Sequence, residues 1–110
     1  MEPLLSQDQF EQLIGRAPTE AKIPPQIVVY FTASWCAPCR RIKYDEIMGA
    51  NKAVYWFKCD VDQNTYTHGF CGLRSIPSFI AIKDMKVVSS LQSSDNLKIV
   101  EWIGQTFSNA

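Results

Sequence analysis

Three apolar residues near the N-terminus recur at the spacing of one face of a helix. They are Phe10, Leu13 and Ile14. Ser6 is followed three residues later by Gln9, which is the capping-box pattern found at the start of many helices. The pattern predicts a first helix over residues 6–16, and the Pro24-Pro25 pair marks a break before the next element.

The next segment has the pattern of a buried strand followed directly by a helix. Residues 26–34, QIVVYFTAS, are apolar on both faces, which is typical of a central strand covered by two layers. Residues 36–48, CAPCRRIKYDEIM, contain good helix formers and place Cys39, Ile42 and Ile47 on roughly one side. We therefore expect a second helix that begins at the cysteines.

The rest of the pattern predicts three more strands and a last helix. Residues 53–62 alternate and are rich in strand formers, whereas residues 63–72 are polar and predict a short helix or turn. Residues 75–83 and 86–92 predict an antiparallel hairpin. Asp95 is expected to cap an amphipathic helix. Its apolar residues are Leu97, Val100, Ile103 and Phe107. The order αβαβαββα predicts an α/β fold, in which a mixed sheet has helices on both faces.

Composition and charge exclude several classes of function. With 110 residues, 46% of them hydrophobic, the chain suits one compact domain over residues 1–110. Eleven basic and eleven acidic residues leave no overall field to attract nucleic acid or an anionic membrane. The N-terminal residues lack a signal-peptide pattern, and no apolar run could span a bilayer. We expect a cytosolic or similarly reducing location.

Two of the four cysteines form a CxxC motif at the predicted strand-to-helix junction. The cysteines are Cys36, Cys39, Cys59 and Cys71, too few for a small disulfide-stapled scaffold. CxxC in a βαβ pattern favours redox chemistry. A helix beginning near Ala37 would place Cys36 at its positive end, which stabilises a thiolate. Pro38 fits the first turn. Cys39 would lie one turn further in, so we expect Cys36 to attack and Cys39 to resolve.

Other interpretations of these residues remain open. A zinc site could be formed by four ligands, although Pro38 and the strand-to-helix context argue against it. The four would be Cys36, Cys39, His68 and Cys71. Cys71 lies in the polar segment, so it is expected to be more exposed than Cys59, and oxidation or dimerisation through Cys71 is a further hypothesis. The basic residues Arg40, Arg41 and Lys43 are either a solvated helix face or a means to steer acidic substrates, for which Arg40 is best placed.

At WCAPC, residues 35–39, the chain resembles the thioredoxin family, and the resemblance extends over nearly its whole length. IVVYFTASWCAPCR resembles the family's strand, active-site loop and helix, KCDVDQN its third strand, and RSIPSFIAIKD the segment with its cis-proline. The resemblance implies that Pro77 is this cis-proline beside the disulfide. It also implies that the Ile76 main chain pairs with an extended substrate and that Trp35 covers the disulfide.

The resemblance further implies a thioredoxin fold and a protein disulfide reductase that works through a mixed disulfide. No cofactor besides the Cys36–Cys39 disulfide is expected. The implied partners are proteins with disulfides and an NADPH-dependent thioredoxin reductase, with neither nucleic acid nor membrane, and the protein is expected to be a monomer. The alternative is a thioredoxin-like interaction module or assembly subunit with little turnover, which would bind partners through Trp35, Ile76 and Pro77.

The chain departs from the family pattern at several positions. Ala37 replaces a glycine, which should shift the redox potential somewhat. Tyr30 replaces a buried aspartate that takes or relays the proton of the resolving cysteine, and a phenol, protonated at neutral pH, cannot serve as that base. Lys58 matches the family's lysine near that aspartate and is expected to stay in the proton path. Tyr44 replaces a proline that kinks the second helix, so we expect a smaller kink.

Overall fold

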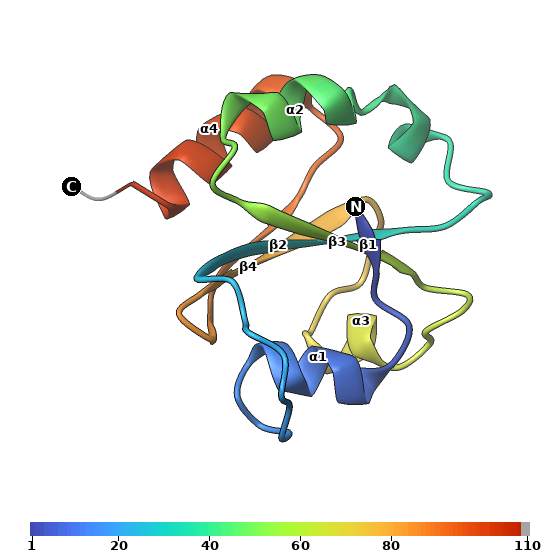
Figure 1. The fold of residues 1–110 in the computed structure, drawn as a ribbon. Coiled ribbons are helices and arrows are strands. Elements are labelled where there is room, and N and C mark those ends of the chain that lie inside the picture. Colours follow the sequence, from blue (N-terminus) through green and yellow to red (C-terminus); the bar gives the residue numbers. More distant parts are fainter. Residues whose placement is uncertain (109–110) are drawn as a thin grey trace.

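The computed structural model describes residues 1–108 and shows a five-stranded sheet between two layers of helices (Figure 1). The strands are β1 (Glu2–Pro3), β2 (Gln26–Thr32), β3 (Tyr55–Asp60), β4 (Ser78–Lys83) and β5 (Lys86–Gln92). The helices are α1 (Gln7–Leu13), α2 (Tyr44–Ala50), α3 (Thr67–Phe70) and α4 (Asn96–Thr106), with a short 3-10 helix, η1 (Pro38–Arg41). No helix within residues 1–108 has the length and apolar character needed to cross a membrane.

The sheet has the strand order β1-β3-β2-β4-β5 and mixes both directions of pairing. Strand β2 runs parallel to β3 and antiparallel to β4, so the predicted mixed sheet is confirmed. The two-residue strand β1, which pairs parallel to β3, was not predicted because two residues carry no detectable period. The first helix is shorter than predicted, since α1 ends at Leu13 and Gly15 follows with φ of 72°.

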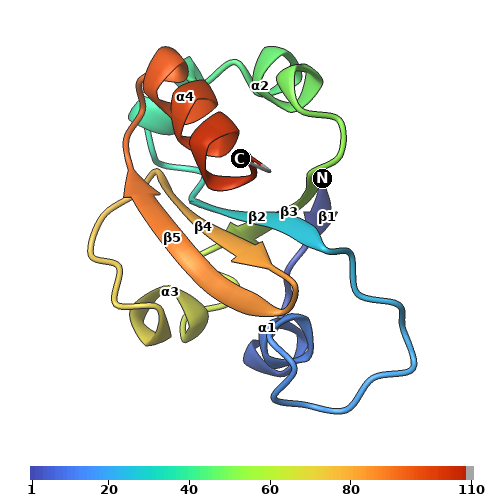
Figure 2. The same ribbon diagram turned by 90° about the vertical axis from the view of Figure 1, so that its left-hand side faces the viewer.

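Both faces of the sheet are buried. Helices α2 and α4 cover one face, and α1 and α3 cover the other (Figures 1 and 2). Side chains of β2 alternate between the two layers, with Val28 and Tyr30 facing α2 and α4, and Val29 and Phe31 on the opposite face. This explains why β2 has no polar side chain before Thr32 except Gln26 and the hydroxyl of Tyr30.

The predicted hairpin is confirmed, and its turn has an uncommon composition. Asp84 and Met85 connect β4 to β5, and both have positive φ, 50° and 64°. Positive φ at both central positions matches the twist of a two-residue hairpin, for which glycine or asparagine is the usual choice. The side chain of Met85 lies against Gly15, which is how this turn contacts the end of α1.

The prediction of one helix from Cys36 onward is wrong. The four-residue η1 ends at Arg41, Ile42 is extended with φ of −78° and ψ of 129°, and α2 starts only at Tyr44. Asn96 of α4 fills the break: the Lys43 N–H donates to its Oδ1 at 2.7 Å, and its Nδ2 donates to the Arg41 carbonyl at 3.1 Å. The expected smaller kink is also wrong, because the helix is interrupted completely.

The N-cap predicted for the last helix is confirmed in α4, but Leu97, which was predicted to be on its apolar face, is exposed. The carboxylate of Asp95 accepts the Lys98 N–H at 3.1 Å. Leu97 is 67% exposed and faces solvent, whereas Ile99 and Ile103 are buried. The buried face of α4 therefore includes Ile99 and Ile103, and Leu97 lies outside it.

Candidate active site

The CxxC motif forms a disulfide at the carboxyl end of β2. Cys36 and Cys39 are joined, with their Cα atoms 5.4 Å apart, and their residues are only 3% and 4% exposed. The Cys36 N–H donates to the carbonyl of Ala33 at 3.1 Å, which turns the chain after the strand. The Cys39 N–H donates to Cys36 Sγ at 3.3 Å. A donor aimed at this sulfur would stabilise a Cys36 thiolate in the reduced protein.

The residues around the motif hold the loop in place. Ala37 has helical φ and ψ and precedes η1, and Pro38 is the first residue of η1, where its missing N–H costs nothing. Trp35 is 64% exposed. Its indole Nε1 donates to the carboxylate of Asp62 at 2.8 Å, which fixes the ring on the rim of the site.

The Ile76–Pro77 peptide bond is cis, as predicted. Pro77 is buried and precedes β4, whose first residue, Ser78, lies opposite Phe31 of β2. The cis-proline therefore lies beside the end of β2 from which the cysteine loop leaves. Within residues 1–108 we find no hydrogen bond to the main chain of Ile76, so this segment is open to an extended ligand.

A hollow of about 210 Å³ opens beside the disulfide. Its lining residues are Tyr30, Thr32, Ala33, Ser34, Cys36, Cys39, Arg40, Tyr44 and Lys58. Tyr30 on β2 and Lys58 on β3 are paired in register, which brings them to the same position of the sheet. Lys58 is exposed, whereas Tyr30 is 1% exposed. The predicted proximity of Tyr30 and Lys58 to the cysteine pair is therefore observed, while their roles in proton transfer stay predictions.

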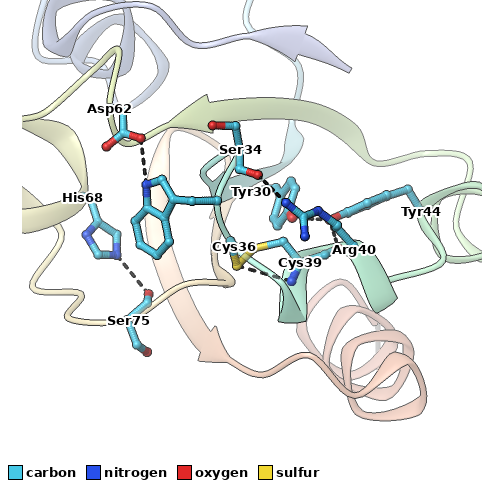
Figure 3. Close-up of a disulfide and its surroundings, with 10 residues drawn as sticks. Tyr30, Ser34, Cys36, Cys39, Arg40, Tyr44, Asp62, His68 and Ser75 are labelled. Atoms are coloured by element: carbon cyan, nitrogen blue, oxygen red, sulfur yellow. Dashed lines mark hydrogen bonds between the residues drawn. A yellow bond between two sulfur atoms is a disulfide. The ribbon is translucent and has the colours of Figure 1, made fainter.

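Two tyrosines connect this hollow to the main chain of the resolving cysteine (Figure 3). The Tyr44 hydroxyl donates to the Cys39 carbonyl at 2.8 Å and forms a second, short hydrogen bond with the Tyr30 hydroxyl. Because the single hydroxyl proton of Tyr44 is in the hydrogen bond to the Cys39 carbonyl, Tyr30 is the donor in the hydrogen bond between the two hydroxyls. Burial, and then the contact with Tyr30, hold the pKa of Tyr44 well above its ordinary value. Tyr44 therefore stays protonated as the pH rises past neutrality.

Sequence reasoning did not find Tyr44 as a site residue. Its place in the sequence, after a basic run and before Asp45, carries no catalytic signal. The side chain reaches Cys39 only because the chain breaks at Ile42 and restarts as α2 at Tyr44. Sequence reasoning also missed Asp62, which was expected only as part of a strand. Its carboxylate instead accepts the hydrogen bond from the Trp35 indole.

A second hollow, of about 270 Å³, lies on the other side of the motif. Its lining residues are Trp35, Val61, His68, Arg74, Ser75 and Ile76. The His68 ring is hydrogen-bonded through Nε2 to the carbonyl of Ser75 at 3.0 Å, which ties α3 to the segment before the cis-proline. Figure 3 shows Arg40 and Tyr44 on one side of the disulfide, and His68 and Ser75 on the other.

The remaining cysteines are free thiols in the layer away from the disulfide. Cys59 is 0% exposed and packs among the core residues that face α1 and α3. Cys71 is half-buried, which confirms that it is the more exposed of the two. Burial, with a smaller effect from Asp60, raises the pKa of the Cys59 thiol to about 12, and burial raises that of Cys71 to about 11. Both thiols are therefore protonated, and poorly nucleophilic, at neutral pH.

The four ligands of the zinc interpretation are not brought together. Across the described residues 1–108, no group of three or more His, Cys, Asp or Glu side chains is arranged to hold a metal ion. His68 instead contacts the Ser75 carbonyl and the ring of Phe31.

Comparison with known proteins identifies the family. The model of the family described as Thioredoxin matches residues 3–105. The chain belongs to the thioredoxin family. The solved structure of Fasciola hepatica thioredoxin is 34% identical, with a TM-score of 0.80, and the match covers 96% of this chain and 98% of that one. Thioredoxin of Geodia cydonium is 38% identical over 72 residues, which are 64% of this chain and 68% of that protein.

A further relative is much longer than the part it shares with this chain. The TPR repeat-containing thioredoxin of Arabidopsis thaliana is 26% identical over 104 residues, 93% of this chain but 27% of that protein. The family, the fold and the close cysteine pair establish this thioredoxin as a thiol–disulfide oxidoreductase that works by dithiol–disulfide exchange.

Proposed function

We propose that this thioredoxin is a general protein disulfide reductase in which Cys36 attacks the substrate and Cys39 resolves the mixed disulfide. The observation that carries the proposal is the Cys39 N–H directed at Cys36 Sγ, beside the cis-proline, where no hydrogen bond to the Ile76 main chain is found within residues 1–108. Among the described hydrogen bonds, Cys36 Sγ accepts this N–H, and none is found to Cys39 Sγ. The environment therefore favours the thiolate at Cys36.

The reaction transfers two electrons and two protons to the substrate. The Cys36 thiolate attacks one sulfur of a substrate disulfide, so that a Cys36–substrate bond forms and the other substrate sulfur leaves as a thiolate. Cys39 then loses its proton and attacks Cys36 Sγ, which releases the second substrate thiolate and forms the Cys36–Cys39 bond. Both substrate thiolates take up protons from solvent.

The surface around the disulfide would hold the substrate in an extended conformation. The Ile76 main chain would pair with the substrate backbone, while Trp35 and Pro77 would flank the attacked disulfide. Thioredoxin reductase with NADPH would return the disulfide to the dithiol. We place the protein, as a monomer, in a reducing compartment such as the cytosol.

Insulin reduction tests the proposed function. We expect the protein to accelerate the precipitation of insulin chains by dithiothreitol, and to reduce insulin when NADPH and a thioredoxin reductase replace dithiothreitol. The variant Cys36→Ser should lose both activities, and Lys86→Ser, at the far end of the sheet, should keep them. A protein that does not accelerate the reaction over dithiothreitol alone, but binds one partner stoichiometrically and independently of Cys36, would be an interaction module instead.

Mixed-disulfide trapping tests the division of roles. The variant Cys39→Ser cannot resolve the intermediate, so we expect it to retain substrates covalently on Cys36. The double variant Cys39→Ser, Cys59→Ser should trap substrates equally well, because Cys59 is buried as a protonated thiol. Mass spectrometry of the trapped peptide identifies the cysteine, and substrate bound at Cys59 or Cys71 would contradict the assignment.

A further inference from the structure

The two hollows beside the disulfide share one electrostatic feature. The hollow next to Cys39 contains Arg40 and Lys58, and the hollow next to Trp35 contains Arg74. Among the described residues 1–108, no carboxylate lines either of them. The whole chain has a formal net charge of zero, so this positive charge is a local property of the rim.

The side chains of both arginines are exposed. The Arg40 guanidinium donates from Nη2 to the carbonyl of Ser34 at 2.8 Å, which holds it over the loop before the cysteines (Figure 3). Within residues 1–108, neither Arg40 nor Arg74 forms an ion pair. An acidic group also lies at this rim: the carboxylate of Asp62 accepts the indole N–H of Trp35 at 2.8 Å.

The positions of the two arginines relate to the path of a substrate. Arg74 lies two residues before Ile76, whose free main chain would pair with the substrate, and Arg40 follows Cys39 directly. A bound segment that places its sulfur over Cys36 thus runs between a positive charge on the cis-proline side and another on the η1 side. Residues within two or three positions of the attacked cysteine would come close to these charges, since an extended chain advances about 3.3 Å per residue.

We propose that Arg40 and Arg74 select acidic substrates, namely disulfide-containing segments with a carboxylate on each side of the attacked cysteine. The proposal rests on the proposed function and specifies its substrate class. Opposite charges at an exposed rim raise the rate of productive encounter and lower that of basic competitors. Each exposed pair contributes modestly, about a threefold change in rate. The effect must weaken as salt screens the charges, because the Debye length falls from about 10 Å at 0.1 M to about 3 Å at 1 M.

The test uses two peptides that contain the same single disulfide and differ only in the residues flanking one cysteine. One peptide has glutamate two positions before and after that cysteine, and the other has lysine there. The second-order rate constant for reduction of each peptide by the fully reduced protein is measured by rapid quench and chromatography. At about 0.1 M salt we expect the glutamate peptide to react at least about fivefold faster, with the ratio falling below about twofold at 1 M.

Charge-reversal variants assign the preference to residues. Arg40→Glu and Arg74→Glu should each reduce the ratio about threefold or more, and the double variant should prefer the lysine peptide. Arg40→Lys keeps the charge and should keep the preference. Lys86→Glu causes the same change in net charge at the far end of β5 from the disulfide, and should leave the ratio unchanged. Circular dichroism shows that each variant is folded, and reduction of the lysine peptide shows that its cysteine pair still reacts.

The possible results distinguish a failure of the acidic-substrate proposal from a failure of the proposed disulfide reductase function. Equal rates for both peptides, or a preference that Lys86→Glu changes as much as Arg40→Glu does, would overturn the acidic-substrate proposal while insulin reduction persists. Loss of insulin reduction in the unmodified protein would instead overturn the proposed function itself.

Discussion

At the scale of single residues, Tyr30 and Tyr44 distinguish this site from the family pattern. Where the family pattern has a buried carboxylate, this chain has Tyr30. The Tyr30 hydroxyl is hydrogen-bonded to the Tyr44 hydroxyl, which in turn donates to the Cys39 carbonyl. The Tyr44 hydroxyl orders the main chain of the resolving cysteine through this hydrogen bond. It provides no base at neutral pH, because its raised pKa keeps it protonated. Resolution should therefore depend on other proton acceptors, such as solvent that reaches the hollow lined by Lys58.

Replacing Tyr30 by aspartate tests this account. A carboxylate at a position that is 1% exposed loses hydration and leaves space where the ring was, so we expect Tyr30→Asp to lower the free energy of unfolding by about 2–4 kcal/mol. Burial also raises the pKa of that carboxyl toward neutrality, where it can accept the Cys39 proton. Stopped-flow measurement near pH 7 should then show faster resolution of a mixed disulfide with a model substrate.

The matched control is Tyr30→Phe, which keeps the ring and removes the hydroxyl. It should lose about 1 kcal/mol and show no faster resolution, because it adds no base. If folded Tyr30→Asp resolves no faster than the unmodified protein, an existing path through Lys58 or water already suffices, and Tyr30 only packs.

At the scale of elements, the important feature is the break between η1 and α2. Helix α4 supplies the missing partners through one side chain: Asn96 accepts the Lys43 N–H and donates to the Arg41 carbonyl. The break lets α2 start at Tyr44, so that this side chain can reach Cys39. The local geometry of the active-site loop is thus stabilised from the C-terminal helix.

We expect Asn96→Ala to weaken this part of the molecule. Two hydrogen bonds are lost at a partly exposed position, which should lower the free energy of unfolding by about 1–2 kcal/mol in urea denaturation. Hydrogen exchange of the Lys43 amide should become faster. Asn51→Ala, which removes a single turn bond to the Ala53 N–H, is the control and should leave Lys43 protected. Unchanged exchange at Lys43 in Asn96→Ala would show that the break does not depend on α4.

At the scale of the whole molecule, the sheet separates two kinds of cysteine. The reactive pair belongs to the layer with α2 and α4, whereas Cys59 and Cys71 belong to the layer with α1 and α3. The raised pKa values of the second pair, about 12 and about 11, keep these thiols protonated in the folded protein when thiols of the unfolded chain already ionise near 9.0.

This separation predicts a loss of stability in alkaline solution. Between about pH 9 and 12 the unfolded chain binds fewer protons than the folded one, so the free energy of unfolding falls as pH rises. Urea denaturation of the fully reduced protein, at intervals from about pH 8 to about pH 11, should show this decline. Cys59→Ala should be slightly less stable at pH 8 but decline less steeply, since it removes one such thiol. Parallel curves for the two proteins would refute the contribution of Cys59.

Local signals were sufficient for the position of the site and for most of the fold. The apolar run of β2 predicts a strand buried on both faces, Asp95 predicts the start of α4, and the CxxC spacing predicts the disulfide, because each depends on residues close together in the sequence. The resemblance around Pro77 located the cis bond. Each of these features depends on residues within a single helix, strand or loop.

The tertiary structure decided what lies around the disulfide. The helix break depends on a contact between residues 53 apart in the sequence, Lys43 and Asn96, and the hydroxyl pair joins Tyr30 to Tyr44 across 14 residues. The positive rim likewise combines Arg40 of η1 with Arg74 of the cis-proline segment. Helical propensity alone favours one continuous helix after Cys36, whereas in the folded molecule Asn96 of α4 provides hydrogen-bond partners for the main-chain groups at the interruption.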